Sequence, residues 1–459
     1  METLMKKHAL AALFCALPAY APFSYSGALE EVTLEKIKSV EVGEPKSPPL
    51  KRWTIAVYMN GKSNIEPFAL ADLNRFETAG SDDNVNIVAE IGRSKGLDND
   101  TQADGDWSGV RRYYVRKDGD KERIASDLVA ELGNPDMGDW KEAASFLKWA
   151  KEVYPAQRYM FIIWDHGWGW IDPQKPGENL LDGGDKSISH DFVSGNYIKT
   201  TELSKIFRQA GRVDLYASMA CFMQMAEVAY EIRDYADVIA GSEEVIQLPS
   251  FNFEDFFTLM LGNPDSDAEK AGVFLVDTFR EMYARPEYQE MLVATKYGTQ
   301  LSAIRGAGLN KFGELIKKIS ETLKKYPDTA ALARAKTEVL RFEVGDESTD
   351  PDKLISFYAD ICHFLELVEK HSDKSLPGYP ELKSLTGEFR TFLDGELVIK
   401  NVYSNKDRTG KDYSNTHGIS MHVPGKPGNL IGYYPTYGSL AFEKATRWSE
   451  TVKYLETVE

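Results

Sequence analysis

The feature that most constrains this chain is an alternation of short apolar runs with amphipathic stretches between residues 51 and 265. Between the runs, residues 65–79, 140–153 and 201–210 carry apolar side chains at the spacing of a helix face. Strands that are apolar throughout are buried on both faces, and the intervening helices provide the crossovers of a parallel sheet. The pattern predicts an α/β domain at 51–265 with a mostly parallel sheet. The predicted strands are 53–59, 85–89, 110–115, 159–164, 213–217 and 238–240.

Beyond residue 265 the pattern changes. Residues 266–459 are predicted to form a C-terminal, mainly helical domain with short strands. One strand is expected near 301–304, and one helix is expected from Lys353 to Lys370. A chain of 459 residues exceeds the usual size of one domain, which agrees with such a division.

The N-terminus has the pattern of an export signal. Lys6 and Lys7 precede an apolar run over 9–21, and small residues follow up to Ala28. We therefore predict a signal peptide at 1–28, a charged, proline-containing tether at 29–50, and a secreted, periplasmic or extracellular protein. No later run reaches the length of ~18 apolar residues that a spanning helix needs, so no membrane span is expected.

The net charge and the cysteine content limit the partners and the chemistry that this chain can have. The formal net charge of -17 argues against nucleic acid as a partner, because binding phosphates needs a basic face. Without the signal, two cysteines remain, Cys221 and Cys362. In an exported protein they could form one disulfide. Alternatively, one is a reactive thiol and the other a buried one.

Two segments carry the candidate chemistry. Trp164-Asp165-His166-Gly167-Trp168-Gly169-Trp170 follows the apolar run 159–164. Met219-Ala220-Cys221-Phe222-Met223 follows the run 213–217 and is predicted to open a helix that continues to about Asp234. Both segments therefore lie past the carboxyl ends of buried strands, which is where open α/β sheets collect their ligands.

These residue types suit nucleophilic catalysis. A helix amino terminus and a nearby imidazole both favour a thiolate, so we expect Cys221 to be the nucleophile and His166 its base. The backbone N–H groups of Gly167 and Cys221 are expected to stabilise an oxyanion. Each residue alone has an ordinary structural explanation, a buried thiol or a loop histidine, and only the shared position of the two segments favours catalysis.

The other histidine and cysteine residues fit a catalytic role less well. His417-Gly418 precedes a predicted strand instead of following one, and Cys362-His363 lies on a predicted helix whose adjacent residues point in different directions. His190 is expected at the surface. The sequence holds no His-Glu-x-x-His or paired Cys-x-x-Cys motif, so no metal ligands are assigned.

Several stretches resemble the clostripain family of cysteine peptidases in the caspase-like clan. They are YMNGKSNIE at 58–66, NVNIVAEIGR at 84–93, IIWDHGWGW at 162–170, the run 213–244 around the cysteine, QLSAI at 300–304 and THGISMHVP at 416–424. The resemblance implies a caspase-like α/β/α sandwich with a Cys221–His166 dyad. It also implies an endopeptidase that acts through a thioester acyl-enzyme on protein or peptide substrates, with a preference for Arg or Lys before the scissile bond.

One position departs from the family pattern. Family members have an Asp two residues before the cysteine, where this chain has Met219. A thioether cannot pair with a cationic side chain. Ser242 and Glu243 also match the family and are expected to line the specificity pocket, with Glu243 as a replacement acid. The alternative is that the chain is a catalytically inactive relative that binds peptides or proteins.

The resemblance requires no cofactor for the chemistry. The polar loop 171–194 is long enough to be cleaved during maturation, and its Asp residues could bind calcium, although they lack an EF-hand spacing. The sequence contains no indication of oligomeric state.

Overall fold

A computed structural model describes residues 50–97, 99–171, 187–247, 249–294, 298–344, 355–405, 410–425 and 434–458. The chain separates into two units, 1–49 and 50–459, and only the second is described. The predicted signal peptide, and the tether up to residue 49, lie outside the described residues. Over the part that is described, none of the helices combines the length and apolar character needed to cross a bilayer.

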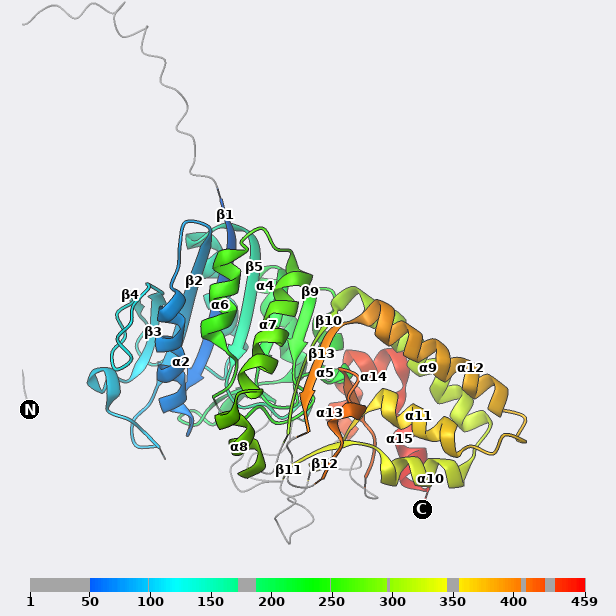
Figure 1. Ribbon diagram of the computed structural model, residues 1–459. Coiled ribbons are helices and arrows are strands. Elements are labelled where there is room, and N and C mark those ends of the chain that lie inside the picture. Colours follow the sequence, from blue (N-terminus) through cyan, green and yellow to red (C-terminus); the bar gives the residue numbers. More distant parts are fainter. Residues whose placement is uncertain are drawn as a thin grey trace, which may run out of the picture. The chain divides into compact units, whose positions relative to one another are not determined.

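The second unit is built around a nine-stranded sheet with the order β13-β10-β9-β8-β5-β1-β2-β3-β4 (Figure 1). The five central strands, from β9 to β2, pair in parallel, whereas two strands at each edge pair antiparallel. The strands are β1 Lys51–Gly61, β2 Val85–Arg93, β3 Gly109–Tyr114, β4 Asp127–Glu131, β5 Ala156–Trp164, β8 Val213–Met219, β9 Ala236–Gly241, β10 Thr299–Arg305 and β13 Val398–Ser404.

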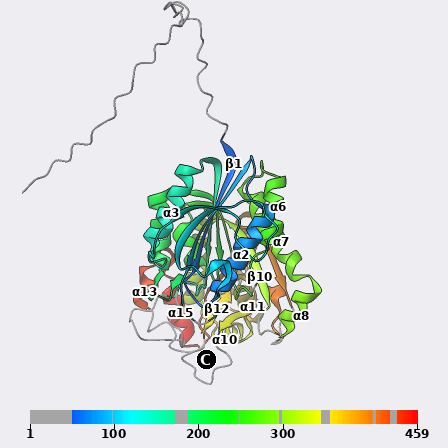
Figure 2. The same ribbon diagram turned by 90° about the vertical axis from the view of Figure 1, so that its left-hand side faces the viewer.

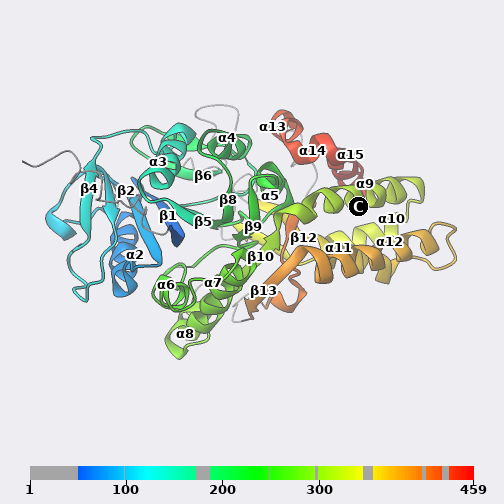
Figure 3. The same ribbon diagram turned by 90° about the horizontal axis from the view of Figure 1, so that it is seen from above.

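Helices cover both faces of this sheet (Figures 2 and 3). One face carries α2 Glu66–Ala79, α6 Phe253–Gly262 and α7 Ala268–Tyr283, and the other carries α3 Trp140–Val153, α4 Thr200–Ala210 and α5 Ala226–Ile232. Alternate residues of a strand point to opposite faces. In β1, Tyr58 therefore packs in the core beneath α3–α5, and Val57 packs in the core beneath α2, α6 and α7. This is the predicted α/β/α sandwich.

The remaining elements are mostly C-terminal helices with two small sheets. The helices are α8 Pro286–Ala294, α9 Leu309–Lys325, α10 Thr329–Glu338, α11 Ile361–His371, α12 Tyr379–Phe392, α13 Tyr434–Ser439, α14 Ala441–Thr446 and α15 Trp448–Glu456. β11 Arg341–Val344, β12 Ile355–Asp360 and β14 Ser420–His422 form one small sheet, and β6 Ile188–Asp191 and β7 Asn196–Ile198 form the other.

The predicted boundary at residue 265 does not coincide with an edge of the large sheet. β10 and β13 come from the C-terminal region, yet β10 pairs with β9 and β13 pairs with β10. Whether residues 51–265 and 266–459 fold as separate domains stays a prediction.

The expected helix from Lys353 to Lys370 is wrong over its first part. Tyr358 lies in β12, opposite Phe342 of β11 and His422 of β14, and α11 begins only at Ile361. The carboxylate of Asp360 accepts a hydrogen bond from His363 N at 2.8 Å and so caps this later helix start. Aromatic residues in the run 355–359 favour a strand, and pairing on both sides outweighs the helical spacing.

Candidate active site

The structure brings the two sequence motifs together at the carboxyl ends of β5 and β8. Trp164, the last residue of β5, lies opposite Met219, the last residue of β8. Asp165 N donates a hydrogen bond to Met219 O at 3.3 Å, which keeps the chains together beyond the strands. His166 and Cys221 each lie two residues past this pair, so they leave the sheet at the same level.

Gly167 packs directly on the backbone of the cysteine segment. A Cβ atom at Gly167 would lie 2.6 Å from Cys221 O and 2.8 Å from the Cβ of Ala220. Since real Cβ atoms do not come this close to neighbouring atoms, only glycine fits here. Gly167 also forms an isolated antiparallel bridge with Ile188, which fixes the loop from its other side.

His166 is held by a residue that sequence reasoning missed. Its Nε2 lies 2.7 Å from Oδ1 of Asn64, and its ring stacks on Phe192 at a centroid distance of 6.2 Å. An amide oxygen only accepts, so Nε2 carries the proton and Nδ1 retains the lone pair. Burial lowers the pKa of His166 to about 4, so the imidazole is neutral at physiological pH. Asn64 follows β1 within the YMNGKSNIE stretch, and this position is its one sequence signal.

Cys221 has a partly buried, neutral thiol. Ile246 N donates a hydrogen bond to its Sγ at 3.3 Å. Burial, together with the nearby carboxylates of Glu244 and Asp165, raises the pKa of Cys221 to about 12. Both cysteines of the described chain, Cys221 and Cys362, are free, so the structure does not contain the disulfide considered as an alternative.

The expected helix start at Cys221 is wrong. α5 begins at Ala226, because Phe222 adopts a left-handed backbone conformation with φ 61° and interrupts the helical path. The helix dipole acts mainly within the first turn and therefore favours a thiolate at Cys221 less than expected. A strained conformation next to a candidate nucleophile is typical of functional sites.

Asp165 ties the histidine loop to its surroundings. Its side chain is 2% exposed and accepts hydrogen bonds from His190 N and from Ser63 Oγ, the latter at 3.4 Å. Ser63 precedes Asn64, so one carboxylate links the β1 loop that holds His166 with β6. The expectation that His190 lies at the surface is wrong. His190 is 3% exposed and its ring stacks on Tyr197, because β6 folds over the site.

The three predicted specificity residues lie next to the cysteine segment, with buried side chains. Met219 is 3% exposed and packs in the core beneath α2, α6 and α7. Ser242 Oγ accepts a hydrogen bond from Glu244 N, and Ser242 O accepts one from Gln224 N. The carboxyl group of Glu243 accepts a hydrogen bond from Gly418 N at 3.0 Å, and burial together with the neighbouring Asp360 carboxylate raises its pKa.

Glu244 is the acidic residue of this segment whose charge helps to raise the pKa of Cys221. Its backbone oxygen accepts a hydrogen bond from Phe222 N at 3.3 Å. Its carboxylate accepts hydrogen bonds from Tyr413 Oη and Val245 N, each at 2.7 Å. Glu244 is adjacent to the predicted Glu243, and only the backbone geometry distinguishes the two neighbours.

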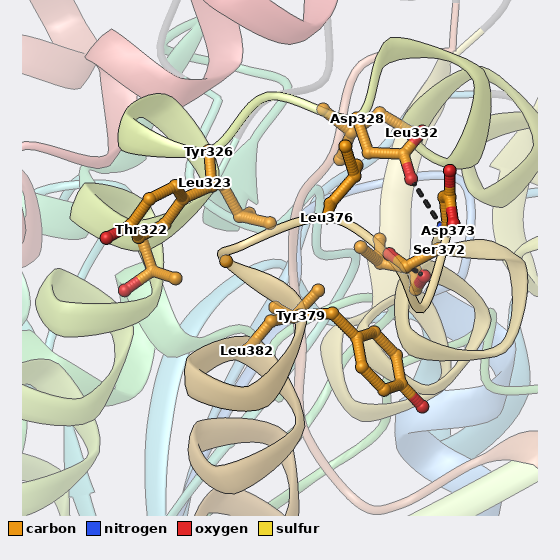
Figure 4. A pocket seen from close by; sticks show the side chains of 12 residues that line it. Thr322, Leu323, Tyr326, Asp328, Leu332, Ser372, Asp373, Leu376, Tyr379 and Leu382 are labelled. Atoms are coloured by element: carbon orange, nitrogen blue, oxygen red, sulfur yellow. Dashed lines mark hydrogen bonds between the residues drawn. The ribbon is translucent and has the colours of Figure 1, made fainter.

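A pocket between α9, α10, α11 and α12 lies away from these residues (Figure 4). It includes neither His166 nor Cys221. It is lined by Thr322, Leu323, Tyr326, Asp328, Leu332, Val368, Ser372, Asp373, Leu376, Gly378, Tyr379 and Leu382. Most of the polar loop 171–194, namely residues 172–186, lies outside the described residues, so its cleavage and calcium binding stay predictions.

Comparison with known proteins places this arrangement in a family. The model of the clostripain family matches residues 57–455. Clostripain of Hathewaya histolytica is 29% identical over 217 residues, which are 44% of this chain and 41% of that protein, so the match spans about two fifths of its length.

Two solved structures share the fold. A secreted C11 cysteine protease from Bacteroides thetaiotaomicron, in complex with an irreversible peptide inhibitor, matches with a TM-score of 0.59 and 19% identity over 87% of this chain and 99% of the other. An inactive zymogen C11 protease from Parabacteroides distasonis matches with a TM-score of 0.60 and 16% identity over the same shares. The predicted caspase-like fold class is confirmed, and the chain belongs to the clostripain family.

Proposed function

We propose that this chain is an exported cysteine endopeptidase in which Cys221 is the nucleophile and His166 is the base. The contact of Gly167 with the Cys221 backbone carries this proposal, because it packs the histidine loop against the cysteine segment. Membership of the clostripain family supports the activity. The similar Bacteroides thetaiotaomicron protein is described as secreted, which supports export together with the predicted signal peptide.

The resting pair is a neutral thiol and a neutral imidazole. The pKa of Cys221 is raised to about 12 and that of His166 is lowered to about 4, so neither group is charged near pH 7. The proton therefore moves from Sγ to His166 Nδ1 as sulfur attacks the scissile carbonyl carbon. The N–H groups of Gly167 and Cys221 stabilise the resulting oxyanion.

Collapse of the tetrahedral intermediate breaks the C–N bond, and the leaving amine takes the proton from His166. A thioester on Cys221 remains. Water then attacks the thioester carbonyl and gives a proton to His166, and the departing sulfur takes it back. The cycle yields an amine and a carboxylic acid and restores both residues. It uses no cofactor.

We further propose that the enzyme accepts Arg or Lys before the scissile bond through an acid beside Cys221. Both Glu243 and Glu244 accept hydrogen bonds within the protein. The electrostatic effect of Glu244 on Cys221 favours Glu244 for this role over Glu243, the replacement acid expected from the sequence. Met219 occupies the position of the family's Asp, so the basic preference is weaker than in relatives that have both acids. Ser242 accepts a hydrogen bond from Glu244 N and so helps to fix the segment that contains this acid.

Turnover of fluorogenic peptides by matched cysteine variants tests the proposal. Cys221→Ala is expected to abolish cleavage, whereas Cys362→Ala retains it, with folding of both checked by circular dichroism. No turnover by the unmodified mature chain would favour the inactive, peptide-binding relative. Equal activity in Cys221→Ala and the unmodified chain would remove Cys221 as the nucleophile.

A further inference from the structure

A thiol, a carboxylate and an imidazole meet at the beginning of α11, apart from the proposed catalytic pair. Sγ of Cys362, a carboxylate oxygen of Glu366 and a ring nitrogen of His417 all lie within 4.8 Å of one another. Cys362 and Glu366 are four residues apart on α11, so their side chains leave the same face of the helix. His417 reaches them from the segment that precedes β14.

His417 is already oriented as a metal ligand. Its Nδ1 lies 2.9 Å from Oδ1 of Asp360, a fully buried carboxylate. Asp360 is fixed in turn by hydrogen bonds from His363 N and His417 N. The Nδ1–H bond leaves Nε2 to face Glu366, at 3.8 Å from its Oε1. A carboxylate behind a histidine is the usual support for metal-binding imidazoles, because it fixes the ring and its tautomer.

We propose that Cys362, Glu366 and His417 bind a borderline-soft divalent cation of the Zn²⁺ type, with solvent completing the coordination. Zn²⁺ accepts sulfur, nitrogen and oxygen ligands together, whereas Ca²⁺ and Mg²⁺ take oxygen ligands. The cation binds a thiolate and an unprotonated Nε2, so binding releases protons from Cys362 and His417 to solvent. Glu366 and His417 are 32% and 16% exposed, which leaves the cation a path from solvent.

Arg390 is a competitor for Glu366, one of the three proposed ligands. Its Nη1 lies 2.8 Å from Oε1 of Glu366, and its side chain is 60% exposed. Because the guanidinium side of this ion pair is exposed, the pair contributes little, about 0–1 kcal/mol, and the guanidinium can move into solvent when a divalent cation arrives. Removing Arg390 should therefore strengthen cation binding.

Titration calorimetry with Zn²⁺ tests the site in the full chain carrying Cys221→Ala, so that the proposed nucleophile does not contribute. One high-affinity Zn²⁺ per chain is expected. Cys362→Ser and His417→Gln, each added to this background, should weaken binding at least tenfold, and Arg390→Ala should strengthen it several-fold. His371→Gln is the matched control, because His371 also lies on α11 but pairs with Glu338.

Co²⁺ provides a second readout that does not depend on affinity. A thiolate-to-cobalt charge-transfer band is expected in the Cys221→Ala chain and should disappear in Cys362→Ser, even if His417→Gln fails to fold. Absence of stoichiometric Zn²⁺ binding would overturn the proposal. Affinities in Cys362→Ser and His417→Gln equal to that of the background would overturn it as well.

Discussion

Asn64 holds the base of the proposed reaction through a single hydrogen bond of 2.7 Å to His166 Nε2. A hydrogen bond of this kind contributes about 0.5–1.5 kcal/mol, so Asn64→Ala should lower kcat about 2- to 10-fold while KM changes little. Asn64→Asp places a carboxylate beside the imidazole and should raise the pKa of His166. Because the base must be unprotonated, the acid limb of the kcat/KM profile should then move to higher pH. Unchanged kcat and an unshifted profile in both variants would exclude a positioning role.

Met219 and Glu244 test the specificity of the proposed pocket. A charged hydrogen bond to a substrate cation is worth about 1.5–3 kcal/mol, or roughly 10- to 150-fold in selectivity. Met219→Asp should therefore raise the ratio of Arg to Gln cleavage at least several-fold, and Glu244→Gln should lower it. Matched peptides that differ only before the scissile bond measure this ratio. Strict Arg specificity in the unmodified enzyme, with no change in Met219→Asp, would contradict the account.

The sequence singles out some of these residues and conceals others. His166 and Cys221 stand out because histidine and cysteine are uncommon in this chain and the two residues follow two apolar runs in the same way, and Gly167 stands out because it comes directly after His166. Asn64 does not, because an asparagine after a strand is ordinary in turns. Glu244 and Ile246 N act through backbone geometry at Cys221, which leaves no pattern in the sequence.

At the level of elements, the packing of the histidine loop on the cysteine segment is the contact on which the site depends. Gly167→Ala would place a Cβ 2.6 Å from Cys221 O, so one of the two backbones must move. Overpacking of this kind costs about 1–3 kcal/mol, and we expect a lower melting temperature together with a large loss of kcat. Gly387→Ala is the control, since nothing lies within 4 Å of its Cβ position on α12. Full turnover by Gly167→Ala would contradict the proposed geometry.

Elements with strong periodicity are predictable from the sequence, and short or edge elements are not. The central strands and α2, α3 and α4 follow from apolar spacing. β4 cannot be predicted in this way because most of its residues are exposed, and exposed edge strands lack an apolar signal. The start of α5 depends on the left-handed conformation of Phe222, which tertiary contacts impose.

For the whole molecule, buried ionisable groups make stability depend on pH. Burial raises the pKa of Glu227 to about 7. Between its ordinary pKa and this value the folded state retains a proton that the unfolded state releases. The contribution of Glu227 to stability is therefore lost as pH rises through about 7, by up to roughly 3 kcal/mol.

Glu227→Gln removes this dependence. The amide oxygen can still accept the hydrogen bonds from His422 N and Tyr437 Oη, each at 2.9 Å. Urea unfolding measures the free energy of unfolding of both chains at pH 5 and at pH 8.5. The difference between the variant and the unmodified chain should change in favour of the variant when the pH is raised from 5 to 8.5. Other buried acids affect both chains equally and do not contribute to this difference. The same stability difference at both pH values would show that Glu227 does not titrate as described.

The central claim is that Cys221 carries the acyl group, and trapping the intermediate tests it most directly. The mature enzyme is mixed with an activated peptide ester, quenched in acid within milliseconds, digested and mapped by mass spectrometry. We predict one acyl group on the fragment that contains Cys221 and none on the fragment that contains Cys362, with the adduct lost in Cys221→Ala. An acyl group on any other residue, with turnover persisting in Cys221→Ala, would contradict the account.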